Sequence, residues 1–576
     1  MTTPRARVTV WRYCAAALVL LSWTSQAIPQ PATVRFDNAT DAAGLHTGLA
    51  EEWGMIAVAD YDGDGWDDVY IGHHGMFGMG DVMGSHTWPR GGQLFRNTRQ
   101  GGFEEQTELL PLVTEETEHR HQVVWCDIDR DGDEDLIIGT GFDDSRDAVG
   151  NRDLWLRNDG NRFTEIAQAL GVEDRLSKVF AITCFDLDAN GWPDVLTLQA
   201  PQASIGRGQL HHLWMNYGGR FVEEANRRGL VMPANQAKTP YAIDCADFNR
   251  TGYPSCIGTG NNYSYWLLNI GRAFRWLTGV YEPIADLSPY LHDGAWADFN
   301  GDGLLDAAVV DTFNNRGNSI VKVHCNNGSQ SVAINHADGL RLCWTSSVAF
   351  GVNFASAASE PGSLAVGDFD NDGSPDLFVT RDRGLVTSGR AAKGPDYLFM
   401  NNGAAQLSEM AQAAGVAGPV GARVGGGGVA VIDYDRDGRL DLIVGYNAMH
   451  HPGPFRLYRN VTTNNYKWVG FILRAPQPLG AWISIEACGR RRVHQLSART
   501  GWLAQDSRNV HFGLGDCSGP VSVTVRWPGG RQAEAAVAAG AYHIITTTGF
   551  APVTPPTSPP VPAPTSPPMH PGPGGR

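Results

Sequence analysis

Aspartates recur along this chain at a spacing suited to binding a metal ion. In residues 60–68 they alternate as Asp60, Asp62 and Asp64, then Gly65 follows and Asp68 closes the segment. The pattern D-x-[DN]-x-[DN]-G-x-x-D, or a degraded form of it, begins at seven points 51 to 70 residues apart, namely Asp60, Asp127, Asp186, Asp247, Asp298, Asp368 and Asp433. We number these segments loops 1 to 7. Hard oxygen ligands at alternate positions of a tight turn are what Ca²⁺ requires, so the pattern predicts calcium binding.

Six loops keep a carboxylate or amide oxygen at each of positions 1, 3, 5 and 9. About six Ca²⁺ ions are therefore expected, and their predicted ligands are Asp60, Asp62, Asp64 and Asp68; Asp127, Asp129, Asp131 and Asp135; Asp186, Asp188, Asn190 and Asp194; Asp298, Asn300, Asp302 and Asp306; Asp368, Asp370, Asp372 and Asp376; and Asp433, Asp435, Asp437 and Asp441. Position 6 is glycine in all seven loops, as a turn with positive φ favours.

The flanks of the loops argue against an EF-hand. An EF-hand carries a bidentate glutamate at position 12 and a helix on each side. Position 12 here is apolar or Thr, as in Ile71, Ile138 and Val444, and short β-branched runs surround each loop. Such runs are typical of buried strands, so each loop is expected to connect the two strands of a β-hairpin.

Loop 4 has lost most of its acidic ligands. It reads Asp247, Asn249, Thr251, Gly252 and Ser255, which leaves one carboxylate at the ligand positions. We expect no metal there. Cys245 and Cys256 bracket this loop on strands that should be neighbours, and we interpret them as a disulfide that holds the hairpin without an ion.

Each repeat carries further strand signals after its loop. A strand ending in an L-x-x-N-like pattern, at Asn97, Asn158, Asn216, Asn401 or Asn460, is followed by a glycine-rich turn and, in most repeats, a strand opening with phenylalanine. Four strands per repeat are typical of a propeller blade. The chain also begins with a phenylalanine strand at residues 36–40 that has no blade before it, while the last repeat ends at Asn460 without one. Pairing these ends predicts an all-β, seven-bladed propeller over residues 33–461, closed by its N-terminal strand; an open solenoid is the alternative.

These hairpins, with their L-x-x-N and phenylalanine strands, resemble FG-GAP/VCBS repeats such as those of integrin α-subunit propellers. Residues 467–547 resemble the ASPIC/UnbV domain at Gly480-Ala481 and at residues 501–505, 512–515 and 527–530. Together the two parts resemble the cartilage acidic protein group of secreted proteins, although no EGF-like module is visible. The resemblance implies an extracellular calcium-binding protein. Independently of it, the alternation of Val521, Val523 and Val525 predicts a small C-terminal β-sandwich.

The two ends of the chain have the composition of export and tether segments. Residues 1–27 combine arginines, an apolar run and a small-residue cleavage site, which predicts a signal peptide. No other segment is apolar enough to span a membrane, so the mature chain is expected to be secreted. Residues 549–576 are rich in proline, which predicts an extended, disordered tail.

After signal cleavage, eight cysteines remain in an oxidising environment. Plausible pairs are Cys245–Cys256, Cys325–Cys343, Cys488–Cys517 and Cys126–Cys184, although sequence alone does not decide the connectivity.

Charge and motifs narrow the functional classes. The net charge is −16, and no basic stripe offers a footprint for nucleic acid. We find no nucleophile elbow, metalloprotease motif, P-loop or kinase signature. We therefore expect a non-enzymatic extracellular binding or adhesion module whose partner is a protein or a glycan. The alternatives are a lectin or a polysaccharide-active enzyme on the same scaffold, and a structural matrix or wall component tethered by the proline-rich tail.

Overall fold

A computed structural model describes the chain between residues 34 and 552. The described residues are 34–45, 55–72, 92–112, 120–140, 152–174, 178–200, 211–230, 240–260, 265–278, 291–311, 320–326, 328, 340–347, 361–381, 394–403, 407–420, 425–447, 455–474, 478–498 and 500–552. In these ranges the regular secondary structure is almost entirely β-strand, so the all-β prediction is confirmed. The predicted signal peptide, residues 1–27, lies outside the described residues.

Residues 36–460 form seven groups of four antiparallel strands. In chain order they are β2 (Met55–Ala59), β3 (Asp68–Gly72), β4 (Gly92–Asn97) and β5 (Phe103–Glu105); β6 (Arg120–Cys126), β7 (Asp135–Thr140), β8 (Leu154–Asn158) and β9 (Phe163–Glu165); β10 (Val179–Phe185), β11 (Asp194–Gln199), β12 (His212–Asn216) and β13 (Phe221–Glu223); β14 (Pro240–Ala246), β15 (Ser255–Gly260), β16 (Tyr265–Asn269) and β17 (Phe274–Thr278); β18 (Leu291–Ala297), β19 (Asp306–Asp311), β20 (Ile320–Asn326) and β21 (Leu340–Ser347); β22 (Pro361–Gly367), β23 (Asp376–Arg381), β24 (Tyr397–Asn401) and β25 (Leu407–Glu409); and β26 (Gly425–Ile432), β27 (Asp441–Asn447) and β28 (Phe455–Asn460), completed by β1 (Phe36–Asn38). Every predicted loop connects the first and second strands of its group.

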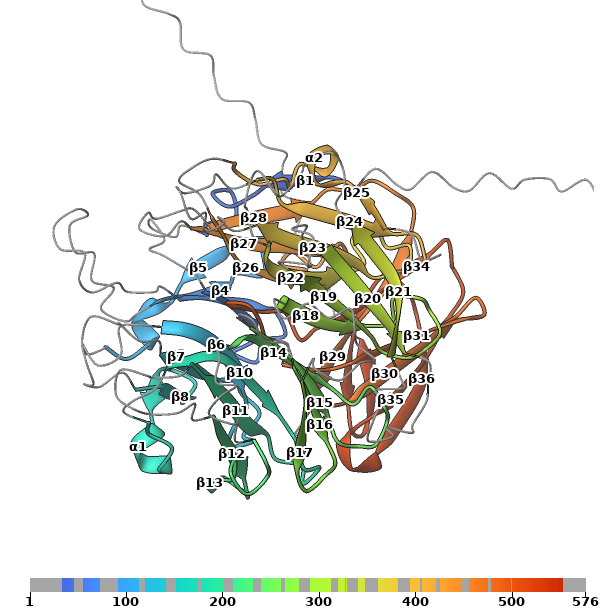
Figure 1. The fold of residues 1–576 in the computed structure, drawn as a ribbon. Helices are drawn as coiled ribbons and strands as arrows, with labels where there is room; N and C mark the ends of the chain where they lie inside the picture. The colour runs from blue at the N-terminus through green and yellow to red at the C-terminus, as the bar shows by residue number, and fades with distance from the viewer. Residues whose placement is uncertain are drawn as a thin grey trace, which may run out of the picture.

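The groups follow one another around the molecule in chain order (Figure 1). The first strand of each group contacts the first strand of the next, and β26 contacts β2. These first strands are buried on both faces, as in β2, because neighbouring groups cover each side. Short helical turns, η1 (Thr107–Leu109), α1 (Ala167–Leu170) and α2 (Ala411–Ala414), follow three of the fourth strands.

The two ends of the repeat region lie together. Strand β1 pairs with β28, with Phe36 opposite Asn460, so the predicted pairing of these segments is confirmed. Buried residues of β2–β4 and of β26–β28 also belong to a single apolar cluster, including Ile56, Val69 and Ile443. The last group therefore packs against the first.

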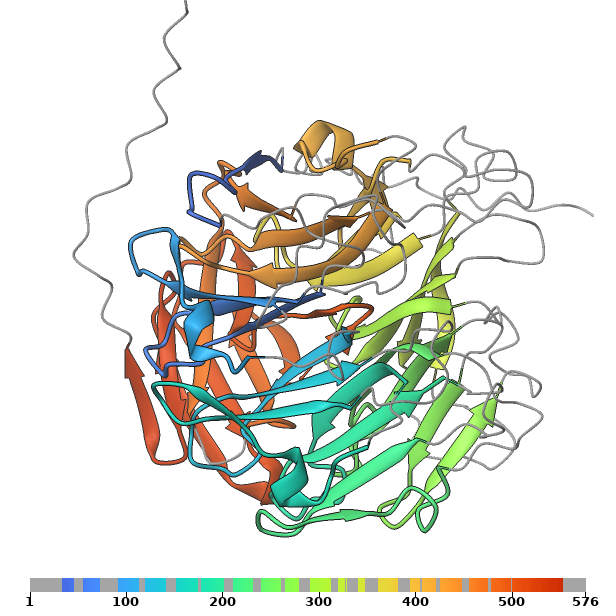
Figure 2. The same cartoon turned by 90° about the vertical axis from the view of Figure 1, so that its left-hand side faces the viewer.

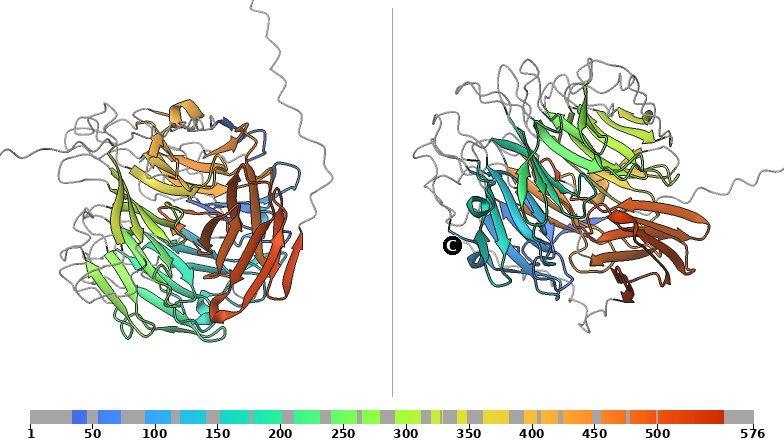
Figure 3. Two further views of the ribbon diagram at one scale, coloured as in Figure 1. Left: turned by 90° about the vertical axis from the view of Figure 1, so that its right-hand side faces the viewer. Right: turned by 90° about the horizontal axis from the view of Figure 1, so that it is seen from below.

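The C-terminal part forms two further four-stranded sheets on one side of the seven groups (Figures 2 and 3). One contains β34 (Val510–Gly515), β29 (Lys467–Arg474), β37 (Tyr542–Thr546) and β38 (Gly549–Pro552). The other contains β31 (Arg490–Gln495), β30 (Trp482–Ala487), β35 (Val521–Arg526) and β36 (Gln532–Val537), with the turn η5 (Pro528–Gly530) between β35 and β36. The alternating burial of Val521, Val523 and Val525 agrees with the predicted period of two. Residues 549–552 are a strand rather than tail, and residues 553–576 lie outside the described part.

A short hairpin from the C-terminal part enters the centre of the seven groups. Its strands are β32 (Thr500–Gly501) and β33 (Ala504–Gln505). β32 pairs antiparallel with β14 and β33 pairs parallel with β2, which joins two groups into one ten-stranded sheet. Trp502 N–H donates to Asp293 Oδ2 of β18 at 3.1 Å, and Gln122 of β6 donates to Gly501 O at 2.9 Å. The hairpin thus satisfies polar groups on several first strands at once.

Three of the predicted disulfides are confirmed. They are Cys126–Cys184, which links β6 to β10 of the next group, Cys245–Cys256 across the hairpin of loop 4, and Cys488–Cys517 in the C-terminal part. Cys325 is also disulfide-bonded, and its predicted partner Cys343 lies among the side chains outside the description.

Candidate calcium sites

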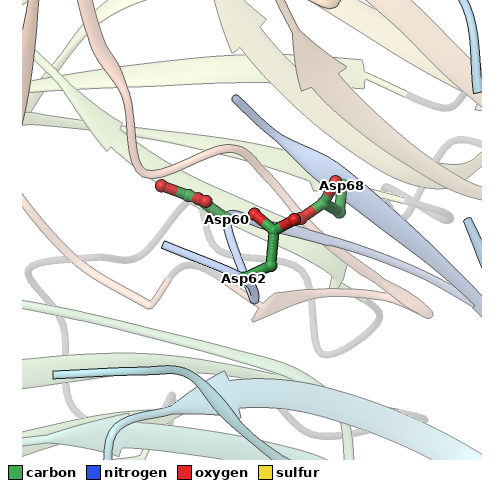
Figure 4. A group of neighbouring side chains, drawn as sticks. All are labelled: Asp60, Asp62 and Asp68. Carbon is green, nitrogen blue, oxygen red and sulfur yellow. The ribbon is translucent and has the colours of Figure 1, made fainter. Parts of the chain in front are cut away.

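Carboxylates at positions 1, 3 and 9 converge in five of the six intact loops. In each group every residue offers one oxygen, and these oxygens lie within 4.8 Å of one another. Figure 4 shows the group of loop 1. The five groups are Asp60, Asp62 and Asp68; Asp127, Asp129 and Asp135; Asp186, Asp188 and Asp194; Asp368, Asp370 and Asp376; and Asp433, Asp435 and Asp441. Loop 5 has Asn300 at position 3, so only Asp298 and Asp306 supply carboxylates at these positions.

In loops 1, 5, 6 and 7 the carboxylate at position 1 has one oxygen that accepts a hydrogen bond and one without a partner, whereas in loop 3 both oxygens accept backbone N–H groups. The N–H of the position-6 glycine donates to Oδ2, for example from Gly65 to Asp60 at 2.8 Å and from Gly373 to Asp368 at 2.7 Å. The Oδ1 atom is buried without a hydrogen-bond partner in loops 1, 2, 5, 6 and 7. A buried acceptor without a donor is costly unless a cation meets it. These five loops therefore fit Ca²⁺ at the point where the pattern places it.

The carboxylate at position 9 anchors the loop to its own sheet. Asp135 Oδ2 accepts the N–H of Ile128 at 2.9 Å, and its Oδ1 accepts the N–H of Asn158 at 2.8 Å. The other five intact loops repeat both bonds with their own position-9 aspartates. A carboxylate oxygen accepts more than one partner, so position 9 retains capacity for an ion.

The position-5 side chains accept hydrogen bonds from the backbone of their own loops. Each accepts the N–H of the residue at position 7, as Asp64 does from Trp66 and Asn190 does from Trp192. The same bond recurs at Asp131, Asp302, Asp372 and Asp437. None of these residues belongs to the converging groups within the described part of the chain. Their bonds shape the turn, and direct ligation by position 5 stays a prediction.

Burial makes these carboxylates unusually basic without a cation. It raises the pKa of Asp60 and Asp186 to about 6 and that of Asp127 to about 7. Burial is again the largest cause at Asp368 and Asp433, where neighbouring aspartates raise the pKa further. A divalent cation offsets both the lost hydration and the mutual repulsion, so the electrostatics favour metal binding.

Loop 4 is organised without unpaired oxygens. Asp247 Oδ2 accepts the N–H of Gly252 at 2.9 Å, and its Oδ1 accepts the N–H of Thr251 at 2.8 Å. Ser255 stands at position 9 and its hydroxyl accepts the N–H of Asn269 at 3.0 Å. The degraded ligands are thus replaced by hydrogen bonds and by the Cys245–Cys256 disulfide.

The asparagines that end the third strands of the groups have a role that the sequence pattern did not reveal. In each group this side chain donates through Nδ2 to the backbone carbonyl at loop position 2 of the preceding group, for example Asn158 to Tyr61 at 2.7 Å. Asn97 reaches Tyr434 O at 2.8 Å, which joins the first group to the last. The full set is Asn97, Asn158, Asn216, Asn269, Asn326, Asn401 and Asn460. Asn269 and Asn326 were not part of the predicted pattern, and Trp266 and Val323 stand three residues before them, where most of the other strands have leucine.

Comparison with known proteins matches the C-terminal part of the chain. Residues 474–549 fit the family model described as ASPIC and UnbV. This region is an ASPIC/UnbV domain. The predicted resemblance is thereby confirmed for this domain, and its 501–505 segment is the hairpin that enters the centre of the seven groups.

The chain is also similar to cartilage acidic protein 1, as predicted. It is 24% identical to the Xenopus tropicalis protein over 265 residues, which cover 42% of this chain and 38% of that protein. It is 31% identical to the Homo sapiens protein over 101 residues, which cover 18% of this chain and 13% of that protein. The chain thus matches less than half the length of these relatives.

The chain has a remote likeness to two solved structures. An Agrocybe aegerita lectin that recognises non-reducing terminal N-acetylglucosamine is 16% identical, with a TM-score of 0.30, over 72% of this chain and 81% of the lectin. The Vibrio cholerae biofilm matrix protein Bap1 is 12% identical, with a TM-score of 0.28, over 88% of this chain and 76% of that protein.

Proposed function

We propose that this chain is a secreted, calcium-stabilised seven-bladed propeller with an ASPIC/UnbV domain, acting as an extracellular binding or adhesion module. The observation that carries the proposal is the recurrence of three converging carboxylates in five equivalent hairpins, four of which also bury an unpartnered position-1 oxygen. Repetition of one metal-ready geometry around a single scaffold favours structural ions over a single reactive centre.

Closure of the ring is supported from three directions. The pairing of β1 with β28 removes two open strand edges, which otherwise invite aggregation. The apolar cluster shared by the first and last groups buries their faces against each other. The Asn97 to Tyr434 bond repeats between the last and first groups the contact that every other neighbouring pair makes. A solenoid with free ends would offer none of these.

An extracellular setting is supported by the disulfides, which persist in oxidising compartments. In the described part of the chain no helix is long and apolar enough to cross a membrane. The similarity to cartilage acidic protein 1 agrees with this setting. We propose a non-enzymatic role, in which the rigid sheets present a surface to an extracellular protein or glycan.

The first test is the metal content of the mature protein. We expect Ca²⁺ to remain bound after gel filtration at about five or six ions per chain, and to be removed by EGTA together with a large loss of thermal stability. A chain that binds no Ca²⁺ and melts identically in EGTA contradicts the proposal.

A screen against glycan and polysaccharide arrays, with and without Ca²⁺, then separates the two ligand classes. Calcium-dependent sugar binding identifies a glycan partner. A silent array identifies a protein partner as the target of the next search.

A further inference from the structure

The ASPIC/UnbV domain lies directly on loop 7. Tyr542 of β37 donates its hydroxyl hydrogen to Asp433 Oδ2 at 2.8 Å. His511 Nε2 lies 3.1 Å from the carbonyl oxygen of Gly438, which can only accept a hydrogen bond. Trp468 occupies the space next to Gly438, where a Cβ atom would come within 1.8 Å of the indole. Three side chains of the C-terminal part, two of them within residues 474–549, therefore cover the turn of loop 7.

The contact from Tyr542 acts on a ligand carboxylate. Asp433 Oδ2 accepts both this hydroxyl and the N–H of Gly438, whereas Asp433 Oδ1 is buried with no hydrogen-bond partner. Two donors hold one oxygen and so orient the other toward the space shared with Asp435 and Asp441. Loop 3 orients its equivalent carboxylate internally, because the N–H groups of Asn190 and Gly191 occupy both oxygens of Asp186. Loop 7 takes part of this support from outside the repeat.

Gly470, Trp468 and Arg436 pack closely around the ring of Tyr542. Gly470 lies opposite Tyr542 in the parallel pairing of β29 and β37, and a Cβ on Gly470 would come within 2.2 Å of the phenol ring. The ring packs against Trp468, with centroids 5.2 Å apart, and against the guanidinium of Arg436, 5.2 Å away. Tyr542 is only 5% exposed, so these contacts hold its hydroxyl against Asp433.

From this geometry we propose that Tyr542 is a positioning residue for the calcium site of loop 7, so that calcium binding in this loop and docking of the ASPIC/UnbV domain strengthen each other. The inference rests on the proposed calcium function and deepens it. Removing a residue that hydrogen-bonds to a metal ligand commonly lowers metal affinity about 10- to 100-fold. Linkage between two binding events is reciprocal, so each side of the contact gives its own test.

The experiment follows hydrogen exchange by mass spectrometry across a titration of free Ca²⁺ with the full mature chain. In the Tyr542→Phe variant we expect the calcium midpoint for protection of residues 433–441 to rise about 10-fold, while residues 186–194 keep the wild-type midpoint. Gln495→Ala is the matched control. Gln495 Oε1 accepts the N–H of Asp247 at 2.7 Å, so this variant removes an equally direct contact of the same domain at the loop where we expect no ion.

A reciprocal variant covers the case in which Tyr542→Phe fails to fold. Asp433→Asn weakens the ligand itself, and at saturating Ca²⁺ we expect faster exchange in residues 540–546 of the ASPIC/UnbV domain. Asp186→Asn, in a loop supported internally, should leave that segment unchanged. Equal effects of the two variants on residues 540–546 overturn the proposal.

The outcomes distinguish a failure of the proposed calcium function from a failure of the coupling alone. If no loop of the wild-type chain gains protection with Ca²⁺, the proposed function fails and this inference fails with it. If loop 3 responds to Ca²⁺ but loop 7 keeps its wild-type midpoint in Tyr542→Phe, only the coupling is overturned. A shift in loop 7 that Gln495→Ala does not reproduce supports it.

Discussion

Loops 2 and 4 occupy equivalent hairpins, β6–β7 and β14–β15, but they hold their buried carboxylates in different ways. In loop 2, Asp127 Oδ1 is buried without a partner, and two further aspartates converge on the same space. In loop 4, both oxygens of Asp247 accept N–H groups of the loop itself, and a disulfide closes the hairpin. The same backbone turn is therefore compatible with an ion or with a self-sufficient network.

The comparison shows which residues decide between the two states. Thr251 in place of an acidic position 5 and Ser255 in place of the position-9 aspartate remove repelling charge from loop 4. Burial raises the pKa of Asp127 to about 7, and nearby carboxylates, Glu134 first among them, add to the shift. We therefore expect loop 2 to depend on a cation for stability at neutral pH and loop 4 not to.

Calcium removal should have the largest effect. A site held at 100 times its Kd contributes about 2.7 kcal/mol to the free energy of unfolding, so emptying five sites costs on the order of 13 kcal/mol. We expect EGTA to lower the melting temperature strongly, with faster hydrogen exchange in the intact loops than in loop 4. Excess Mg²⁺ is the control, because its strict octahedral preference suits these loops poorly. Equal exchange in all seven loops after calcium removal would show that loop 4 does not differ from the intact loops.

Single substitutions at position 1 should separate the two kinds of loop. Asp127→Asn is expected to lower the bound calcium by one ion and to destabilise the calcium-loaded protein by about 2–4 kcal/mol, through the lost ion and a poorer ligand. Without calcium the same substitution should stabilise the protein, because it removes a buried, repelled carboxylate. Asp247→Asn should leave the calcium count unchanged. Calorimetric titration and thermal melts measure both quantities, and loss of an ion from the Asp247→Asn variant would contradict the assignment of loop 4.

The asparagines that end the third strands should have the same effect on stability next to an intact loop as next to loop 4. Asn158 and Asn269 make the same Nδ2 bond to the preceding group, at 2.7 Å in both cases, but only Asn158 follows an intact loop. Alanine at either position leaves a buried carbonyl unpaired, which costs about 1–3 kcal/mol. We expect similar losses of stability in urea melts and an unchanged calcium count in both variants. Loss of calcium from Asn158→Ala alone would make the asparagine part of the metal site.

Much of the repeat structure could be predicted from the sequence because its signals are local. The spacing of Asp60, Asp62 and Asp68 predicts their convergence, and the orphan phenylalanine strand at Phe36 predicts its pairing with the strand ending at Asn460. The contact of Tyr542 with Asp433 joins residues that are 109 positions apart, one in the C-terminal part and one in the repeats, and no periodicity of the sequence indicates it. For the position-5 side chains, the pattern does not say whether their oxygens face a backbone N–H or an ion, so their ligation stays a prediction.

The smallest expected effect is a pH dependence that exists only in the metal-free protein. Burial raises the pKa of Asp127 and Asp306 to about 7, above the unfolded value of about 4. A raised folded pKa stabilises the folded state when the group is protonated, so this contribution is lost as pH rises through about 7. We therefore expect the calcium-depleted protein to melt at a higher temperature at pH 6.5 than at pH 8. With Ca²⁺ bound, the carboxylates remain ionised against the cation and this trend should disappear.

Two variants serve as controls for this pH dependence. Asp127→Asn should reduce the pH dependence of the depleted protein, and Asp247→Asn should reduce it less, because Asp247 is held by Thr251 and Gly252. A trend of the same size with and without Ca²⁺ would show that these carboxylates do not bind the ion.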